Sequence, residues 1–249
     1  QGFAVGDRVM SMGRANWAQE IQVPASTLIK VSTEADLLQI GMLKVNPATA
    51  KFMLDHYVDL KPGDWVVQNA GNSAVGRYLI QLAKAKGVHS INIVCREGLE
   101  QELTEIGADL VLVEGEDLPE KVRAEPEDAN IPLAIDAVAG KVTLSLGGIL
   151  SEEGTVVNYG LLSGDPCQLT ADMVVFKGIT LTGFWLAKTL GTMTAEAKQQ
   201  LYGELESLVA SGKISTPVEA TYHLGQLEEA LRHAYLGGRS GKILFTPNG

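Results

Sequence analysis

A glycine-containing loop carries the clearest chemical signal in this sequence: Val66-Val-Gln-Asn-Ala-Gly-Asn-Ser-Ala-Val-Gly76. An apolar run leads into it, and a helical pattern follows. Gly71 is expected to permit a tight turn, and Gly76 to let the helix pack closely against the strand. The usual middle glycine is replaced by Ser73, whose hydroxyl is small and able to donate to a phosphate. We therefore favour a dinucleotide-binding turn, with pyrophosphate at the helix N-terminus, over an ordinary strand-to-helix turn.

The end of the next expected strand distinguishes the two nicotinamide cofactors. An acidic residue there would bind the ribose 2′-OH of NAD, whereas an arginine would accept the 2′-phosphate of NADP. The strand ends in Val94-Cys95-Arg96-Glu97. Arg96 favours NADPH. The adjacent Glu97 keeps NAD open, and both charges could also be solvated in a loop.

Two later strands should end at the same edge of the sheet, where ligands bind in folds of this type. They end in Asn158-Tyr-Gly-Leu-Leu162 and Gly183-Phe-Trp-Leu186. From the residues alone, the aromatic rings of Tyr159 and Trp185 are more typical of core packing than of a binding site.

The sequence lacks the residue patterns that a zinc site or a hydrolase would need. The four histidines are scattered, with no cysteine or acidic partner at ligand spacing, so the sequence predicts no zinc site. They are interpreted as structural or surface residues: His56, His89, His223 and His233. Cys95 and Cys167 are far apart and suit reduced thiols in a reducing compartment. No G-x-S-x-G motif or catalytic cysteine context is present, which argues against a hydrolase.

Composition narrows the class further. The chain has 249 residues, of which 45% are hydrophobic, enough for a sizeable core. Its net charge of −10 disfavours nucleic acid and anionic membrane surfaces as partners. No apolar run is long enough to span a bilayer. The chain starts as if within a domain, so we expect the natural N-terminus, with any targeting segment, to lie upstream.

Strand, loop and helix alternate from Leu60 to Phe184, which predicts an α/β fold with a doubly wound parallel sheet. Strands are expected at 65–70, 90–95, 110–113, 131–138, 155–159 and 179–184. Short β-like runs near the N-terminus, at 9–11, 17–23 and 28–31, predict a piece of an antiparallel barrel. Helices at 196–209 and 226–236 and a last strand at 241–245 are expected to return to that piece. Asn46-Pro-Ala-Thr-Ala50 is interpreted as a break between two helices.

The chain resembles the zinc-independent branch of the medium-chain dehydrogenase/reductase superfamily, and within it the mitochondrial-type trans-2-enoyl-CoA (2-enoyl thioester) reductase family. The resembling stretches are collinear: Val45-Asn-Pro-Ala-Thr-Ala50, Leu60-Lys-Pro-Gly-Asp64, Gln68–Gly76, Ile91-Asn-Ile-Val94, Asn158-Tyr-Gly160 and Phe176–Leu186. The resemblance implies a Rossmann domain at 46–187 and part of a GroES-like β-barrel catalytic domain at 1–45 and 188–249.

The resemblance also implies which residues contact NADPH. They are the asparagine of Asn-Pro-x-Thr-Ala, the phosphate loop, the 2′-phosphate segment, two segments along the nicotinamide half and a C-terminal lysine. In this sequence they are Asn46, Asn72, Ser73, Ala74, Val75, Cys95, Arg96, Glu97, Tyr159, Gly160, Leu161, Leu162, Phe184, Trp185, Leu186 and Lys242. No metal ligand is implied. The family's proposed proton donor, a tyrosine, is expected upstream of Gln1, so no catalytic residue is assigned in this chain.

The implied reaction is NADPH-dependent reduction of a trans-2-enoyl thioester carried on CoA or acyl carrier protein. A zinc-independent quinone or alkenal reductase is an alternative, and a non-catalytic NADPH-binding protein is another. The resemblance further implies a homodimer through pairing of the last sheet strand. The expected compartment is the mitochondrial matrix in a eukaryote and the cytoplasm in a bacterium.

Overall fold

The computed structural model describes residues 2–31, 34–115, 117–124 and 129–248. The chain divides into two compact units. The first unit comprises residues 1–48 and 187–249, and the second, here called the sheet unit, comprises residues 49–186. The roles predicted for 46–187 and for the flanking segments stay predictions.

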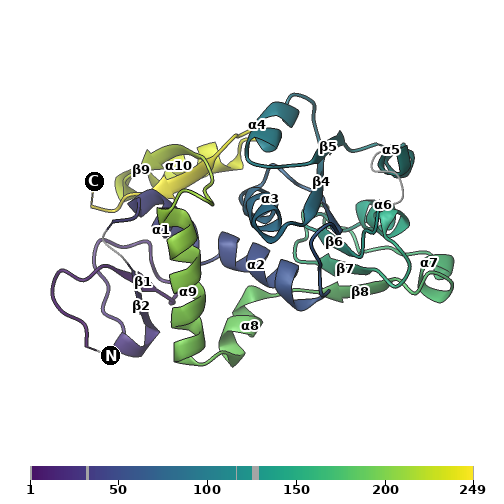
Figure 1. Ribbon diagram of the computed structural model, residues 1–249. Coiled ribbons are helices and arrows are strands. Elements are labelled where there is room, and N and C mark those ends of the chain that lie inside the picture. Colours follow the sequence, from purple (N-terminus) through teal and green to yellow (C-terminus); the bar gives the residue numbers. More distant parts are fainter. Residues whose placement is uncertain (1, 32–33, 116, 125–128, 249) are drawn as a thin grey trace. The chain divides into compact units, whose positions relative to one another are not determined.

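The sheet unit is built on six parallel strands in the order β5-β4-β3-β6-β7-β8 (Figure 1). This is the Rossmann order, with the switch point between β3 and β6. The strands are β3 (Trp65–Gln68), β4 (His89–Val94), β5 (Leu110–Val113), β6 (Leu133–Asp136), β7 (Thr155–Asn158) and β8 (Thr180–Gly183). The predicted doubly wound α/β class is confirmed, although most strands are shorter than expected.

Helices cover both faces of this sheet. They are α2 (Asn46–His56), α3 (Ala74–Lys86), α4 (Glu100–Glu105), α5 (Leu118–Ala124), α6 (Lys141–Ile149) and α7 (Ala171–Val175). Successive side chains of a strand point to opposite faces. Ile93 of β4 therefore joins a core cluster with α5 and α6, whereas Val94 joins one with α3 and α4. Burial on both faces explains why these strands are continuously apolar.

The helix that follows the glycine loop is bounded by its caps. Ser73 caps the N-terminus of α3, and Gly87 ends the helix in the left-handed region with φ 73°. The expected break at Asn46-Pro-Ala-Thr-Ala50 is wrong, because α2 begins at Asn46 and contains all five residues. Proline suits the first turn of a helix, where its missing N–H would have no partner.

The first unit contains two small two-stranded sheets. Strands β1 (Val9–Ser11) and β2 (Leu28–Lys30) pair antiparallel, and β9 (Val218–Tyr222) and β10 (Lys242–Phe245) pair parallel. The expected strand at 17–23 is wrong: the segment is irregular, and Trp17 packs edge-on against Phe245 at 5.0 Å between ring centroids. The helical segments of this unit are η1 (Ala25–Thr27), α1 (Leu37–Leu43), α8 (Leu186–Thr192), α9 (Ala195–Ala210), η2 (Leu224–Gln226) and α10 (Leu227–Tyr235).

Candidate functional site

The glycine loop links β3 to α3 at the switch point of the sheet. The positive φ of the turn falls on Ala70, at 49°, and Gly71 is needed for a different reason. A Cβ at Gly71 would lie 3.0 Å from the Cβ of Asn92 on the neighbouring strand. At Gly76 it would lie 2.5 Å from the carbonyl oxygen of Gly71, so only glycine fits at the start of the helix. The predicted close packing at Gly76 is thus present, and the predicted role of Gly71 in the turn angle is corrected.

The first turn of α3 offers hydrogen-bond donors to a ligand. The hydroxyl oxygen of Ser73 accepts from the N–H of Gly76 at 3.1 Å. In the described part of the chain, the N–H groups of Ala74 and Val75 have no acceptor. Such unpaired donors at a helix N-terminus, with the positive end of the helix dipole, favour an anion.

A buried carboxylate fixes the neighbouring loop after β6. The Asp136 side chain, which is fully buried, accepts from the Thr143 hydroxyl (2.6 Å), the Asn69 amide (2.7 Å) and the N–H groups of Val138 and Ala139 (both 2.9 Å). We call these five residues the Asp136 network. Burial pushes the pKa of Asp136 up, but these four hydrogen bonds outweigh it, and the net pKa lies below the usual value. The carboxylate therefore stays charged and holds the ends of β3 and β6 in register.

Asn69 completes the link, because its side-chain oxygen accepts from the N–H of Ala137 at 2.7 Å. Sequence reasoning missed both Asn69 and Asp136. They directly follow or end adjacent strands at the carboxyl edge, so the rule that located Tyr159 and Trp185 applies equally to them.

Two further buried side chains, those of Gln68 and Arg77, form hydrogen bonds with backbone carbonyl groups of the glycine loop. The Gln68 amide donates to the carbonyl of Gly76 at 3.0 Å and to the side-chain oxygen of Asn92 at 2.7 Å. The buried Arg77 donates from Nε to the carbonyl of Asn72 at 3.2 Å and lies 2.8 Å from Glu102. Sequence reasoning missed Arg77 as well, because a charged residue on the inner face of a helix gives no helical-pattern signal.

The predicted contact segments after β4 and β7 lie at the same edge of the sheet as the loop. Cys95 and Glu97 are exposed, and Arg96 is half-buried. Tyr159 is half-buried, and its hydroxyl interacts with that of Ser73. Burial raises the pKa of Tyr159 to about 12, so the phenol keeps its proton at neutral pH.

Close backbone approach joins the loops after β6 and β7. A Cβ at Gly160 would lie 2.3 Å from the carbonyl oxygen of Ala137. The adjacent Leu161 and Leu162 are exposed. The structure thus brings together the segments 72–75, 95–97 and 159–162 along one edge of the sheet.

The segment after β8 divides into a packing residue and an exposed one. Phe184 is buried, with its ring centroid 6.1 Å from that of Phe52 and 6.5 Å from that of Tyr57. Trp185 is 66% exposed, and Leu186 begins α8. Phe184 therefore serves the core, whereas the core packing that the residues alone suggested for Trp185 is wrong, because that side chain is mostly exposed.

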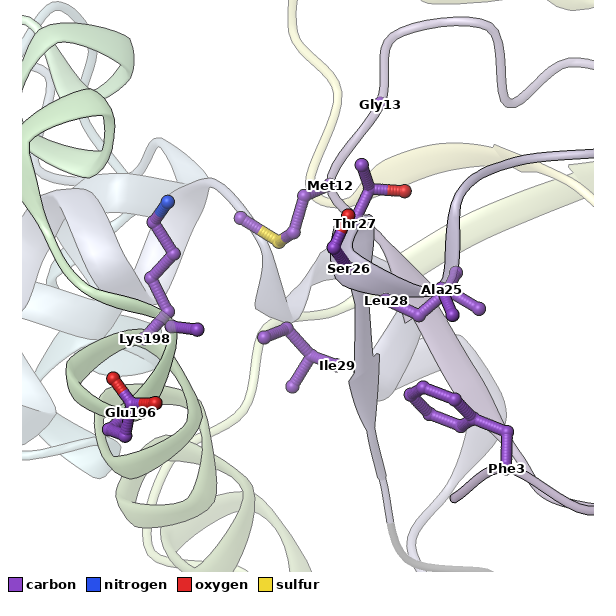
Figure 2. Close-up of a pocket in the computed structure, with 11 residues that line it drawn as sticks. Phe3, Met12, Gly13, Ala25, Ser26, Thr27, Leu28, Ile29, Glu196 and Lys198 are labelled. Carbon is purple, nitrogen blue, oxygen red and sulfur yellow. The ribbon is translucent and has the colours of Figure 1, made fainter. Parts of the chain in front are cut away.

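A pocket of 520 Å³ lies within the first unit, between α9 and the segments around β1 and β2. Figure 2 shows Glu196 and Lys198 of α9 on one side and Met12 and Ile29 on the other. It is lined by none of the residues predicted to contact the cofactor.

The family of this chain follows from its sequence. The sequence family described as zinc-binding dehydrogenase matches residues 74–207. A mitochondrial enoyl-[acyl-carrier-protein] reductase of Caenorhabditis elegans is 34% identical over 261 residues, covering 99% of this chain and 73% of that protein. The chain belongs to the mitochondrial enoyl reductase family of the medium-chain dehydrogenase/reductase superfamily. The resemblance drawn from the sequence is therefore confirmed.

One more relative and two solved structures are also similar to this chain. The corresponding reductase of Dictyostelium discoideum is 33% identical over 224 residues, covering 88% of this chain and 63% of that protein. The structure of Etr1p with NADP and crotonyl-CoA matches with a TM-score of 0.80 at 26% identity, covering 88% of this chain and 67% of that chain. A quinone oxidoreductase from Pseudomonas syringae matches with a TM-score of 0.79 at 21% identity, covering 90% of this chain and 69% of that chain. The quinone enzyme shares the fold alone.

The chain spans 63% of the length of its Dictyostelium relative. Although the family's general description mentions zinc, the described residues contain no group of three or more His, Cys, Asp or Glu side chains placed to hold a metal. His89 instead stacks on Trp65 and lies 2.8 Å from Asp109, and His223 caps η2.

None of the helices in the described ranges is both long and apolar enough to cross a membrane.

Asn46 and Lys242 belong to the first unit, where Asn46 starts α2 and Lys242 starts β10. Their contact with the cofactor, which the resemblance implies, stays a prediction.

Proposed function

We propose that this chain binds NADPH at the carboxyl edge of its six-stranded sheet, and that its protein reduces trans-2-enoyl thioesters. The observation that carries the proposal is the start of α3, where Gly76 admits no side chain and the N–H groups of Ala74 and Val75 have no acceptor in the described part of the chain. A pyrophosphate placed there would accept from both groups and lie at the positive end of the helix dipole.

The neighbouring strand end supports NADPH over NADH. Arg96 follows β4, next to β3, and β4 is held to the loop by a hydrogen bond from the N–H of Gly71 to the carbonyl of Ile93 at 3.0 Å. An arginine at this position suits a 2′-phosphate, since its planar guanidinium can donate two parallel hydrogen bonds. The segment 159–162 would then lie along the nicotinamide half of the cofactor. The interaction of the Tyr159 hydroxyl with that of Ser73 would link this segment to the phosphate loop.

The proposed reaction adds a hydride and a proton across the double bond. Bound NADPH supplies the hydride for the β carbon. Negative charge then develops on the thioester oxygen, where hydrogen-bond donors would stabilise it, and a general acid protonates the α carbon. The contribution we assign to this chain is binding and alignment, by Asn46, Asn72, Ser73, Arg96, Tyr159, Trp185 and Lys242.

The binding part is tested by comparing two helical glycines. Gly76→Ala places a Cβ 2.5 Å from a carbonyl oxygen, whereas Gly148→Ala in α6 makes its nearest contact at an ordinary 3.5 Å. We expect Gly76→Ala to abolish NADPH binding measured by calorimetry and Gly148→Ala to leave it unchanged. Circular dichroism confirms that each variant is folded. Unchanged NADPH affinity in a folded Gly76→Ala variant would overturn the assignment.

Arg96→Gln provides a second test that leaves the fold intact. It should weaken NADPH binding about tenfold or more, because a charge-assisted bidentate contact is lost, while NADH binding stays the same. Equal losses for both cofactors would show that Arg96 does not recognise the 2′-phosphate.

The substrate is tested by NADPH oxidation with the longest natural form of the protein, with a short trans-2-enoyl-CoA and a quinone assayed side by side. Turnover of the enoyl-CoA with little quinone activity supports the proposal. Quinone turnover with an inert enoyl-CoA would make the protein a quinone reductase, and binding without any turnover a non-catalytic NADPH-binding protein. We propose that the protein acts in the mitochondrial matrix if it is eukaryotic, which the names of its mitochondrial relatives support, and in the cytoplasm if it is bacterial.

We also propose that the chain forms a homodimer through β8. This strand is at the edge of the sheet, and its own Leu181 is exposed, as are Val175 and Phe176 just before it in the chain. An exposed apolar edge strand is a template for pairing with another strand. Phe176→Asp should shift the protein from dimer to monomer in analytical ultracentrifugation, while Tyr235→Asp, at an exposed site in the first unit, should not. A Phe176→Asp dimer, or a monomeric unmodified chain, would contradict the proposal.

A further inference from the structure

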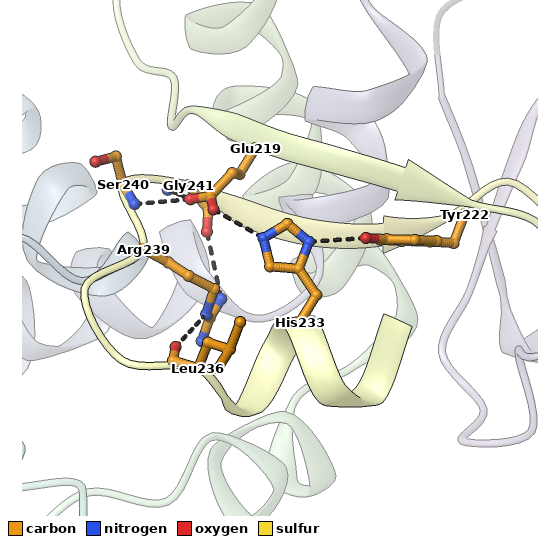
Figure 3. A network of polar contacts seen from close by, with 7 residues as sticks. All are labelled: Glu219, Tyr222, His233, Leu236, Arg239, Ser240 and Gly241. Carbon is orange, nitrogen blue, oxygen red and sulfur yellow. Dashed lines mark hydrogen bonds and ion pairs between the residues drawn. The ribbon is translucent and has the colours of Figure 1, made fainter. Parts of the chain in front are cut away.

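A second carboxylate network lies in the first unit, beside the lysine assigned to the cofactor. Glu219 of β9 lies 2.9 Å from Nε2 of His233 on α10, and Nδ1 of His233 lies 2.8 Å from the hydroxyl of Tyr222 (Figure 3). The other carboxylate oxygen of Glu219 accepts from the N–H groups of Ser240, at 2.8 Å, and Gly241, at 3.1 Å. We call these five residues the Glu219 network.

The network ends at the residue before Lys242. The N–H of Lys242 donates to the carbonyl of Pro217 at 2.8 Å, and a Cβ at Gly241 would lie 2.7 Å from the backbone nitrogen of Glu219. The backbone therefore passes close to the start of β9, and the Glu219 carboxylate fixes the two amides that precede the lysine.

The strand pairing adds a local distortion at the same point. The register of β10 on β9 shifts between Lys242 and Ile243. Irregularities of this kind change the direction of a side chain relative to a regular strand. Lys242 is half-buried, and burial, followed by the nearby Arg239, lowers its pKa. A partly desolvated ammonium group gains from an anionic partner.

Arg239 makes two hydrogen bonds within the loop itself. Arg239 donates from Nε to the carbonyl of Leu236 at 3.1 Å and from a terminal nitrogen to that of Gly241 at 3.4 Å. Figure 3 shows the Arg239 side chain on the side of the loop near Leu236, with Glu219 reaching the loop from β9. Arg239 therefore shapes the loop, whereas Glu219 anchors it to the sheet.

We infer that Glu219 and His233 are positioning residues that hold Lys242 in place for the cofactor. His233 orients the carboxylate, the carboxylate fixes the amides of Ser240 and Gly241, and these fix the backbone that carries the lysine. The inference rests on the proposed role of Lys242 in NADPH binding.

The test is a double-mutant cycle on NADPH affinity in the full chain. Glu219→Ala removes the acceptor for both amides and should raise the Kd for NADPH about tenfold, the effect of one lost charged hydrogen bond. In a Lys242→Ala background the same change should have no further effect, because the residue it positions is gone. Glu219→Gln, which keeps one acceptor oxygen, should restore most of the affinity. Equal effects of Glu219→Ala in both backgrounds would overturn the inference and indicate a general structural role.

A matched control lies on the same helix. Glu228 pairs with Arg232 on the exposed side of α10, and Glu228→Gln should leave the Kd unchanged. The two proposals fail differently. If Gly76→Ala and Lys242→Ala weaken NADPH binding but Glu219→Ala does not, the inference fails and the function stands. If neither Gly76→Ala nor Lys242→Ala affects NADPH binding, the proposed function fails.

Discussion

The sheet unit and the first unit each use one carboxylate to hold two consecutive backbone amides. Asp136 accepts from Val138 and Ala139, and Glu219 accepts from Ser240 and Gly241. Each also accepts from side chains. The difference is exposure, because Asp136 is fully buried whereas the Glu219 side chain is 30% exposed.

This difference extends to the whole units. Among the described residues, and leaving the tyrosines aside, ten polar or charged side chains are buried, and all except Thr216 belong to the sheet unit. A buried group without its partner loses a full hydrogen bond, whereas water replaces the partner of an exposed one. We therefore expect the Asp136 network to determine stability and the Glu219 network to determine only local geometry.

The largest expected effect comes from Asp136→Ala. It leaves the Thr143 hydroxyl, the Asn69 amide and two backbone N–H groups without an acceptor in a buried site. We expect the free energy of unfolding, measured by urea denaturation, to fall by about 3 to 5 kcal/mol. Glu219→Ala is the matched comparison and should lower it far less. Similar losses for the two variants would remove the distinction between the networks.

The next largest effect on stability is expected from Gly160→Ala, which directly alters the edge of the sheet where the cofactor is predicted to bind. The new Cβ would lie 2.3 Å from the carbonyl oxygen of Ala137, so the loops after β6 and β7 must separate. Overpacking of this kind costs about 1 to 3 kcal/mol of stability, measured in the same urea experiment.

Gly183→Ala is the control for Gly160→Ala, since its new Cβ would lie an ordinary 3.7 Å from the nearest atom, the carbonyl oxygen of Asn158. NADPH affinity should fall in Gly160→Ala and stay unchanged in Gly183→Ala. A Gly160→Ala variant with normal stability would show that the two loops move apart freely.

Much of the sheet unit could be predicted because its signals are local. Apolar runs and the helices between them predicted a doubly wound parallel sheet, and the glycine loop predicted the strand-to-helix turn that lies at the switch point. The Asp136 network was within reach of the same reasoning, because Asn69 and Asp136 sit at adjacent strand ends.

The first unit was less predictable because its contacts join distant positions. His233 meets Glu219 across 14 residues, and its pairing needs α10 and β9 to be in place first. The segment 17–23 has the composition of a strand, but in the structure it is irregular and Trp17 packs on Phe245 from the other end of the chain. The strand β9 was not predicted at all, since its alternation of Val218, Glu219 and Ala220 is too short to distinguish from a loop.

Tyr202→Phe should have a smaller effect on stability and tests a buried hydrogen bond in the first unit. The buried Tyr202 hydroxyl donates to the carbonyl of Lys44 at 2.9 Å, joining α9 to the end of α1. We expect a loss of about 1 kcal/mol in urea denaturation. Tyr235→Phe, at an exposed position, should have no effect. No loss in Tyr202→Phe would mean that the hydroxyl is as easily satisfied by water as an exposed one.

The smallest expected effect is the acid response of Glu219. Its hydrogen bond with His233, followed by that from the N–H of Ser240, holds its pKa below the usual value for a glutamate. A carboxyl whose pKa is lower in the folded state stabilises that state above its unfolded pKa and loses this contribution as pH falls through the folded pKa. The amide protons of Ser240 and Gly241 should therefore shift in NMR spectra only below about pH 4.3, the unfolded pKa of glutamate. Glu219→Gln should abolish this pH dependence, while the amides of Val138 and Ala139, held by Asp136, keep theirs. A shift that persists in Glu219→Gln would assign the response to another group.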